Sequence, residues 1–176
     1  MLLTKFDQDV TRLYRSGARK FLVFDIPPLG CTPNIKLKGY NIAKGGCLEV
    51  ANQLVVAYNT AFNSLVDHLN QKLEGVTIIR LNTYNYLRNI LEHGEAYGFT
   101  DTKSACCGSG MFNTEVTCGK TSPQKLFCND VDRHVFWDGT HPTEKVYAMV
   151  SHQIWSGNSS ISYPFNLSTM VMGENN

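Results

Sequence analysis

Asp138 and His141 are the two side chains in this sequence whose types and spacing best suit proton-transfer chemistry. They lie in the segment Trp137-Asp-Gly-Thr-His-Pro-Thr-Glu144, which reads as a loop leading into a helix. A tight turn can place the carboxylate against the Nδ1–H of the imidazole, so that Nε2 accepts a proton from a nucleophile. The same spacing also occurs where an aspartate only forms a turn and a histidine only begins a helix. The spacing alone therefore leaves both interpretations open.

The cysteines favour disulfides over a metal site. Their number is even, and no two of them are spaced two to four residues apart, as paired zinc ligands usually are. Free buried thiols are the alternative, and spacing does not select one connectivity. The disulfide candidates are Cys31, Cys47, Cys106, Cys107, Cys118 and Cys128.

Two glycosylation acceptor patterns, Asn158-Ser-Ser160 and Asn166-Leu-Ser168, lie in the polar C-terminal tail. Together with the cysteines they favour a secreted or extracellular protein. The first nine residues carry charges where a signal peptide has its apolar stretch, so no signal peptide is predicted there.

Composition excludes two classes of function. Lys+Arg 16 nearly balances Asp+Glu 15, so the net charge of +1 provides no electrostatic surface for a nucleic-acid backbone. No apolar run reaches the roughly 18 residues that a membrane-spanning helix needs, so no membrane span is predicted. An apolar fraction of 43% with 18% charged residues is typical of a globular domain.

Hydrophobic periodicity predicts an α/β protein. Apolar residues recur every three or four positions over residues 48–73, and apolar β-forming runs flank this helix at residues 20–26 and 76–81. A strand, a helix and a strand in this order predict a right-handed crossover between parallel strands. The other predicted elements are a helix (2–16), a long connection (27–46), a short helix (84–92), a cysteine-stapled loop (100–135) and a last helix from His141-Pro142.

Two convincing strands are few, because sheets usually have about four to six. The chain therefore reads like the second half of a doubly wound domain. Tyr84 and Tyr86 follow the second strand, at the sheet end where such proteins bind ligands. We interpret them as packing residues, with the lining of an acyl pocket as the alternative.

Six blocks of residues carry a resemblance to a known family. They are Leu13-Tyr14, Gly17-Ala-Arg-Lys-Phe21, Pro27-Pro-Leu-Gly-Cys-Thr-Pro33, Tyr58-Asn-Thr-Ala-Phe-Asn63, Ala105-Cys-Cys-Gly108 and Phe136-Trp-Asp-Gly-Thr-His-Pro-Thr-Glu144. In this order they resemble the plant GDSL esterase/lipase family of SGNH-type hydrolases. The resemblance implies a secreted hydrolase of small-molecule or lipid esters that needs no metal or cofactor, with Asp138 and His141 as its acid and base.

The resemblance also implies a three-layer α/β/α, flavodoxin-like fold with a mostly parallel sheet, here incomplete with about two core strands. Residues 1–155 correspond to the C-terminal portion of such a domain, and residues 156–176 to a polar, frayed tail. The sequence makes no prediction about the oligomeric state.

The sequence departs from the family pattern at the nucleophile. The family's serine lies in a Gly-Asp-Ser block and its oxyanion donors lie in two further blocks, yet residues 1–176 contain neither Gly-Asp-Ser nor Gly-x-Asn-Asp. A base without a nucleophile or oxyanion donors cannot transfer an acyl group efficiently, so the chain alone is expected to be inactive. The alternative is a truncated, non-catalytic remnant or binding module.

Overall fold

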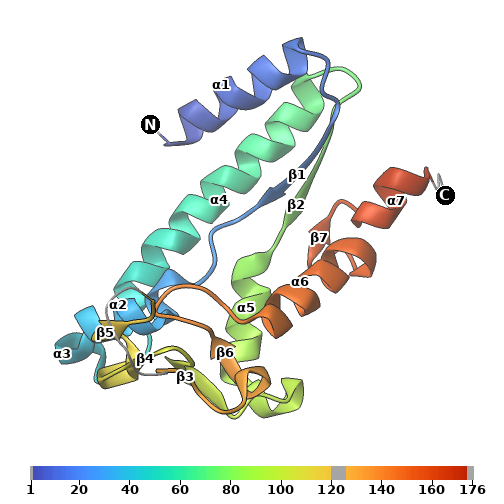
Figure 1. The fold of residues 1–176 in the computed structure, drawn as a ribbon. Coiled ribbons are helices and arrows are strands. Elements are labelled where there is room, and N and C mark those ends of the chain that lie inside the picture. The colour runs from blue at the N-terminus through green and yellow to red at the C-terminus, as the bar shows by residue number, and fades with distance from the viewer. Residues whose placement is uncertain (1, 120–125, 174–176) are drawn as a thin grey trace. The chain divides into compact units, whose positions relative to one another are not determined.

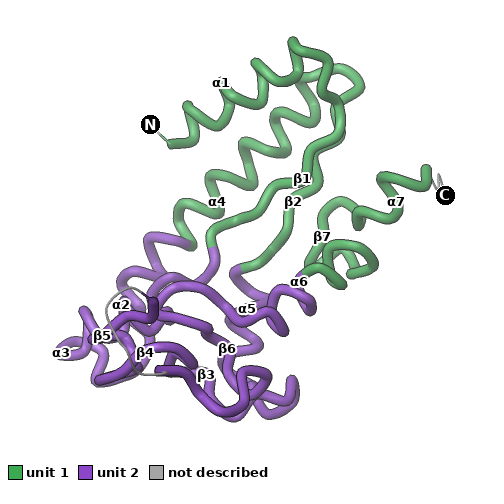
Figure 2. The backbone as a smooth tube through the Cα atoms, viewed as in Figure 1, with its two compact units in different colours: residues 1–26, 56–83, 151–176 green, residues 27–55, 84–150 purple. Residues whose placement is uncertain are grey.

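The computed structural model describes residues 2–119 and 126–173 as the helices and strands drawn in Figure 1. The chain divides into two compact units, coloured separately in Figure 2. The first unit comprises residues 1–26, 56–83 and 151–176 of the chain, and the second comprises residues 27–55 and 84–150. No helix among the described residues is long and apolar enough to cross a membrane.

The first unit contains the predicted parallel pair of strands. β1 (Lys20–Phe24) pairs in parallel with β2 (Thr77–Leu81), from Lys20 opposite Thr77 to Phe24 opposite Leu81. The helix predicted between them is α4 (Glu49–Lys72), which confirms the crossover. β1 forms one edge of this sheet and its Phe24 is 51% exposed, whereas parallel strands are usually covered on both sides. The fold is thus the incomplete α/β arrangement predicted from the sequence.

The core of the first unit lies between the sheet and two helices, α1 (Leu2–Arg15) and α4. Apolar side chains spaced three or four residues apart on each helix share one face, so they bury together against β2. Phe6 of α1 packs edge-on against Phe62 of α4, with ring centroids 5.0 Å apart. The buried members of this core are Val10, Phe62, Val66, Leu69, Leu73 and Ile78.

Polar side chains connect β1 and β2 to α4, and connect the residue after β1 to the start of the helix that follows β2. The Asn70 side chain accepts a hydrogen bond from the Ile78 N–H (2.7 Å) and donates one to the Ile78 carbonyl (3.0 Å). Asn59 makes the same two bonds with Ile26, just beyond β1. The buried Asp25 accepts from the Thr83 N–H (2.7 Å), where α5 (Thr83–Glu92) begins. These bonds satisfy backbone groups that burial would otherwise leave unpaired.

The tail predicted to be frayed contains two elements within its described part, residues 156–173. β7 (Ser162–Tyr163) pairs antiparallel with β2, and Ser162 is fully buried. Asn166 caps the start of α7 (Leu167–Met172), because its side chain accepts a hydrogen bond from the Thr169 N–H. A two-residue strand and a six-residue helix are too short to produce a periodic pattern, which is why the sequence did not predict them. Residues 174–176 of the predicted tail lie outside the described residues.

The second unit is built from short elements. β3 (Asp101–Ala105) pairs in parallel with β6 (His134–Phe136), and β4 (Gly108–Ser109) pairs antiparallel with β5 (Val116–Thr117). The segment predicted as a cysteine-stapled loop therefore contains strands. The predicted connection 27–46 contains three short helices: η1 (Leu29–Cys31), α2 (Pro33–Lys38) and α3 (Tyr40–Ala43). The remaining elements are η2 (Gly94–Tyr97), η3 (Met111–Asn113), η4 (Val131–Arg133) and α6 (Glu144–Ser156).

The last predicted helix begins later than expected. We expected it to start at His141-Pro142, but α6 begins at Glu144. Pro142 instead bridges to Phe136, and Thr143 donates its N–H to the Val135 carbonyl (2.9 Å). Because these bonds hold the segment beside β6, it cannot take helical dihedral angles.

Three disulfides join all six cysteines, and all three lie in the second unit. Their connectivity, which spacing left open, is Cys31–Cys47, Cys106–Cys128 and Cys107–Cys118. The Cys107–Cys118 loop lies inside the sequence span of the Cys106–Cys128 loop.

The packing of α4 predicts a difference between two leucines on the same helix. Leu69 is fully buried, whereas Leu54 is 72% exposed. We expect Leu69→Ala to lower the free energy of unfolding by about 2–5 kcal/mol, because the lost burial and the cavity both destabilise. Leu54→Ala, the matched control, should change it by less than about 0.5 kcal/mol. Urea unfolding followed by circular dichroism measures both, and equal losses would contradict this packing.

Candidate active site

The turn between β6 and α6 places the Asp138 carboxylate against the His141 ring. The Nδ1 atom of His141 lies 2.8 Å from Oδ2 and 3.0 Å from Oδ1 of Asp138. The backbone N–H groups of Thr140 and His141 donate to Oδ1 at 2.8 and 2.7 Å. Aspartate favours such turns because its short side chain reaches the backbone two and three residues ahead. The turn therefore orients the carboxylate with its own backbone before the imidazole adds its contact.

The two side chains differ in exposure and charge. The His141 side chain is 67% exposed and that of Asp138 is 33% exposed. Partial burial raises the pKa of Asp138, but hydrogen bonds from the backbone and ring of His141 and from the Thr140 backbone outweigh this effect. The net pKa lies below its ordinary value, so Asp138 is ionised at neutral pH. An ionised partner at Nδ1 with the rest of the ring open to solvent suits a histidine that takes and returns a proton at Nε2.

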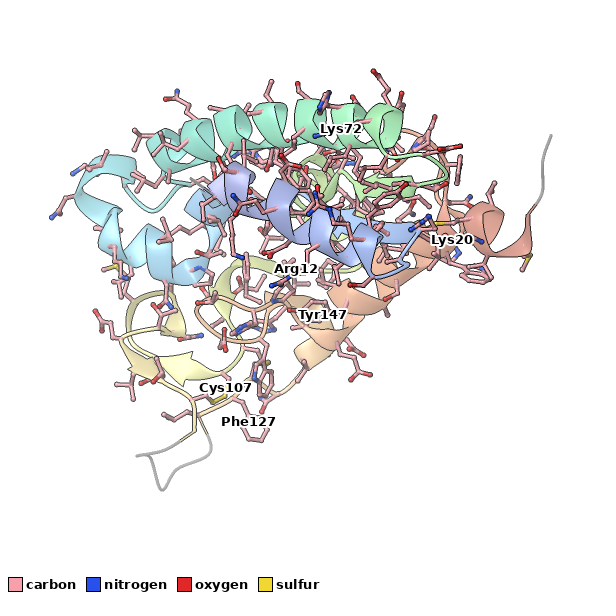
Figure 3. The ribbon with its side chains drawn as sticks, turned by 90° about the horizontal axis from the view of Figure 1, so that it is seen from above. Arg12, Lys20, Lys72, Cys107, Phe127 and Tyr147 are labelled. Atoms are coloured by element: carbon pink, nitrogen blue, oxygen red, sulfur yellow. A yellow bond between two sulfur atoms is a disulfide. The ribbon has the colours of Figure 1, made fainter. Side chains whose placement is uncertain are left out.

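Backbone pairing anchors the start of this turn to the cysteine-rich segment. The Cys106 N–H donates to the Phe136 carbonyl at 2.9 Å, and the Cys107 N–H donates to the Trp137 carbonyl at 2.7 Å. The Trp137 N–H in turn donates to the His141 carbonyl at 2.8 Å, which closes the turn. Cys107 also forms a β-bridge with Phe127, and both residues are labelled in Figure 3.

Asn34 contacts the turn from a distant part of the chain, a contact that the sequence did not predict. Its N–H donates to the Gly139 carbonyl at 2.9 Å, and its side-chain amide donates to Thr140 Oγ1 at 3.1 Å. A Cβ atom added at Gly139 would overlap the Asn34 side chain, so any larger residue there would push the Asn34 amide out of this position. Asn34 follows Pro33 at the start of α2, one residue beyond one of the six family-like blocks, so no sequence signal singled it out.

The other predicted site residues fall into two groups. Cys106 and Cys107 belong to the segment that anchors the turn, and the Cys31–Cys47 disulfide flanks α2, which carries Asn34. The glycosylation candidates Asn158 and Asn166 belong to the first unit, whereas Asp138 and His141 belong to the second. Asn158 is exposed, and its side chain accepts from the Ser160 N–H at 3.0 Å.

Two groups of side chains bring potential metal ligands together in the described part of the chain. They are Cys106, Cys128 and His134, and Cys31, Cys47 and Glu49. Each group contains two cysteines that are joined in a disulfide, and a disulfide sulfur lacks the thiolate charge with which cysteine binds metals. Neither group therefore supplies more than one ordinary ligand.

Comparison with known proteins identifies the family. The family model described as GDSL-like lipase/acylhydrolase matches residues 2–154. The chain is 34% identical to the GDSL esterase/lipase At1g71691 of Arabidopsis thaliana, over 97% of this chain and 43% of the relative. It is 33% identical to At1g71250, over 98% of this chain and 45% of the relative. It is 35% identical to At5g08460, over 97% of this chain and 44% of the relative. Both of these are also GDSL esterase/lipases of Arabidopsis thaliana.

The chain thus spans less than half the length of these curated relatives. The match nevertheless covers nearly all of its own residues, including both members of the Asp138–His141 pair. The chain belongs to the family of GDSL-like lipases/acylhydrolases.

Proposed function

We propose that Asp138 and His141 are the acid and base of a carboxylic ester hydrolase that acts through a serine acyl-enzyme. The observation that carries this proposal is the 2.8 Å contact between His141 Nδ1 and Asp138 Oδ2 on an imidazole that is 67% exposed. In this geometry the neutral ring carries its proton on Nδ1, facing Asp138, and presents Nε2 as the acceptor. The esterase and lipase names of the relatives support small-molecule or lipid esters as the substrate class.

The reaction proceeds in two halves. His141 Nε2 takes the serine hydroxyl proton while the serine oxygen attacks the ester carbonyl, and the alcohol then leaves with that proton. A water molecule next loses a proton to His141 and attacks the acyl-enzyme, and the serine oxygen leaves with the proton as the carboxylic acid forms. Asp138 stabilises the imidazolium in both halves and keeps the ring in one orientation.

The nucleophile is assigned to polypeptide that residues 1–176 do not include. No Gly-Asp-Ser occurs among these residues, and the curated relatives are more than twice the matched length. The chain alone is therefore proposed to be inactive. The missing nucleophile also favours a second candidate function, that of a truncated, non-catalytic binding module.

The disulfides support an extracellular location, because such bonds persist in oxidising compartments. Secretion and glycosylation at Asn158 and Asn166 are part of the proposal.

A chimaera tests the assignment of the base. In the Arabidopsis relative At1g71691, the aligned segment is replaced by residues of this chain, so that the relative supplies the serine. We expect it to hydrolyse p-nitrophenyl butyrate, and His141→Gln to lower kcat/KM by at least about 10³-fold because proton transfer is lost. His68→Gln, at an exposed position on α4, is the matched control and should leave kcat/KM unchanged. Full activity of the His141→Gln chimaera would reject the assignment of the base. Fluorophosphonate labelling of a serine in chain 1–176 would instead reject the placement of the nucleophile outside these residues.

The tautomer of His141 tests the same proposal without the chimaera. In chain 1–176, ¹⁵N NMR should find the neutral ring protonated on Nδ1, because the Asp138 carboxylate accepts there. Asp138→Asn should abolish this preference, and Asp132→Asn, an exposed control, should not. A ring protonated mainly on Nε2 in the unmodified chain would contradict the proposed role.

The lowered pKa of Asp138 predicts a pH dependence of stability. A carboxyl group whose pKa is lower in the folded state stabilises the fold above its ordinary pKa, and this contribution is lost as the pH falls through the lowered pKa. Asp138→Asn should therefore reduce the urea midpoint at neutral pH, and the difference from the parent should shrink in acid. If the two urea midpoints differ by the same amount at neutral and acidic pH, the turn does not stabilise the Asp138 carboxylate.

Asn34 should act as a positioning residue. Asn34→Ala removes the donor to Thr140 Oγ1, so we expect a larger population of the Nε2–H tautomer of His141 and a lower kcat in the chimaera with little change in KM. Asn41→Ala, the same change at an exposed position, should alter neither. If the tautomer population of His141 is unchanged in Asn34→Ala, Asn34 has only a structural role.

A further inference from the structure

Two cavities of different character adjoin the Asp138–His141 turn in the second unit. One, of about 180 Å³, is mixed in polarity, and its lining includes the polar side chains of Asn34, Asn113, Thr114 and Asp138. The other, of about 60 Å³, is mainly apolar. Thr140 lines both, so the turn contributes to a mixed cavity and to a mainly apolar one.

The apolar cavity is formed by three segments that the fold brings together. Leu87 and Leu91 lie one turn apart on α5, so they share a face of that helix. Between them Ile90 points into the core and is fully buried, which leaves the two half-buried leucines to line the cavity. Phe136 at the end of β6 and the Pro27–Leu29 segment supply the other apolar walls.

His141 does not itself line this cavity, but it is adjacent in the chain to residues that do. Its two sequence neighbours, Thr140 and Pro142, are both lining residues. Hydrogen bonds to Asn34 and to Asp138 fix Thr140, and a bridge to Phe136 fixes Pro142. The cavity and the imidazole are therefore held by the same turn.

We propose that the apolar cavity binds the acyl chain of a short-chain ester, an inference that rests on the proposed role of His141. A hydrocarbon chain gains free energy when it leaves water for apolar walls. In the larger cavity the same chain would strip water from amide, hydroxyl and carboxylate groups of the lining without replacing their hydrogen bonds, which is unfavourable. The acyl chain is thus directed to the side of Leu87 and Leu91.

The volume of the cavity limits the length of the chain. One water position takes ~10–15 Å³ on this measure, so about 60 Å³ accommodates a row of about four small groups. Affinity should rise about fourfold with each added methylene until the cavity is full, and then stop rising. Leu91 lines this cavity, so a change in its size should move the limit. Tyr84 and Tyr86, the alternative acyl-pocket residues, do not line the cavity, and Tyr86 packs against the core instead.

Binding can be measured on chain 1–176 itself with three probes: ethyl acetate, ethyl butyrate and ethyl hexanoate. Leucine-methyl NMR should show saturable shifts at Leu87 and Leu91. From acetate to butyrate the affinity should increase by about 15-fold, the value for two methylenes, with no further increase for hexanoate. Shifts confined to other leucines, or a further 15-fold increase for hexanoate, would overturn the proposal.

Two variants of opposite effect and one control sharpen this test. Leu91→Phe should fill the cavity and weaken ethyl butyrate binding at least about tenfold, and Leu91→Ala should enlarge it and make ethyl hexanoate the best probe. Leu54→Phe, at a position that is 72% exposed, should change neither result. If circular dichroism shows that Leu91→Phe is unfolded, the test rests on the order in which Leu91→Ala binds the three esters. If that variant binds them in the same order as the parent chain, the proposal is rejected.

Failure of this inference is distinguishable from failure of the proposed function, because ester binding requires no proton transfer. Absent shifts together with a chimaera that depends on His141 would reject the acyl cavity and retain the base. Shifts at Leu87 and Leu91 together with a fully active His141→Gln chimaera would retain an ester site and reject the base.

Discussion

Backbone hydrogen bonds from Cys106 and Cys107 extend the pairing of β3 with β6 as far as Trp137, the residue before Asp138. The whole site depends on this extension. A turn whose first residue is fixed in a strand ladder can hold an exposed imidazole against a carboxylate, although exposed ion pairs on free side chains contribute little by themselves. The contact between Asp138 and His141 thus owes its geometry to the strands rather than to its own strength.

The second unit pre-organises the turn from two sides. The cysteine-rich segment fixes its beginning, and Asn34 fixes its middle through Gly139 and Thr140. An imidazole held in this way would lose little entropy if it engaged a nucleophile, which is the usual advantage of a rigid supporting shell. The two cavities beside the turn are defined by the same supports, since Asn34 lines one of them and Thr140 lines both.

Local sequence patterns predicted the long elements and the contact between Asp138 and His141, and failed where a contact joins distant residues. The periodicity of α4 and its flanking strands predicted the parallel crossover because each is long enough to repeat a pattern. Asn34 and Thr140 carry no joint signal, since only the folded chain brings them together. Thr143 shows the same limit: its bonds to β6 outweigh the helix-start signal of Pro142 and delay α6 to Glu144. The cysteine pairing likewise needed three-dimensional proximity.

The neighbouring cysteines at the end of β3 have a consequence for how the chain oxidises. Exchanging their partners would join Cys106 to Cys118 and Cys107 to Cys128, in loops that differ from the native ones by a single residue. Chain entropy cannot distinguish these two isomers, because loop closure depends only weakly on length. The folded backbone distinguishes them, because the Cys128 N–H donates to the Cys106 carbonyl at 2.7 Å and holds these two residues side by side. The native pairing is therefore selected by backbone hydrogen bonds rather than by loop length.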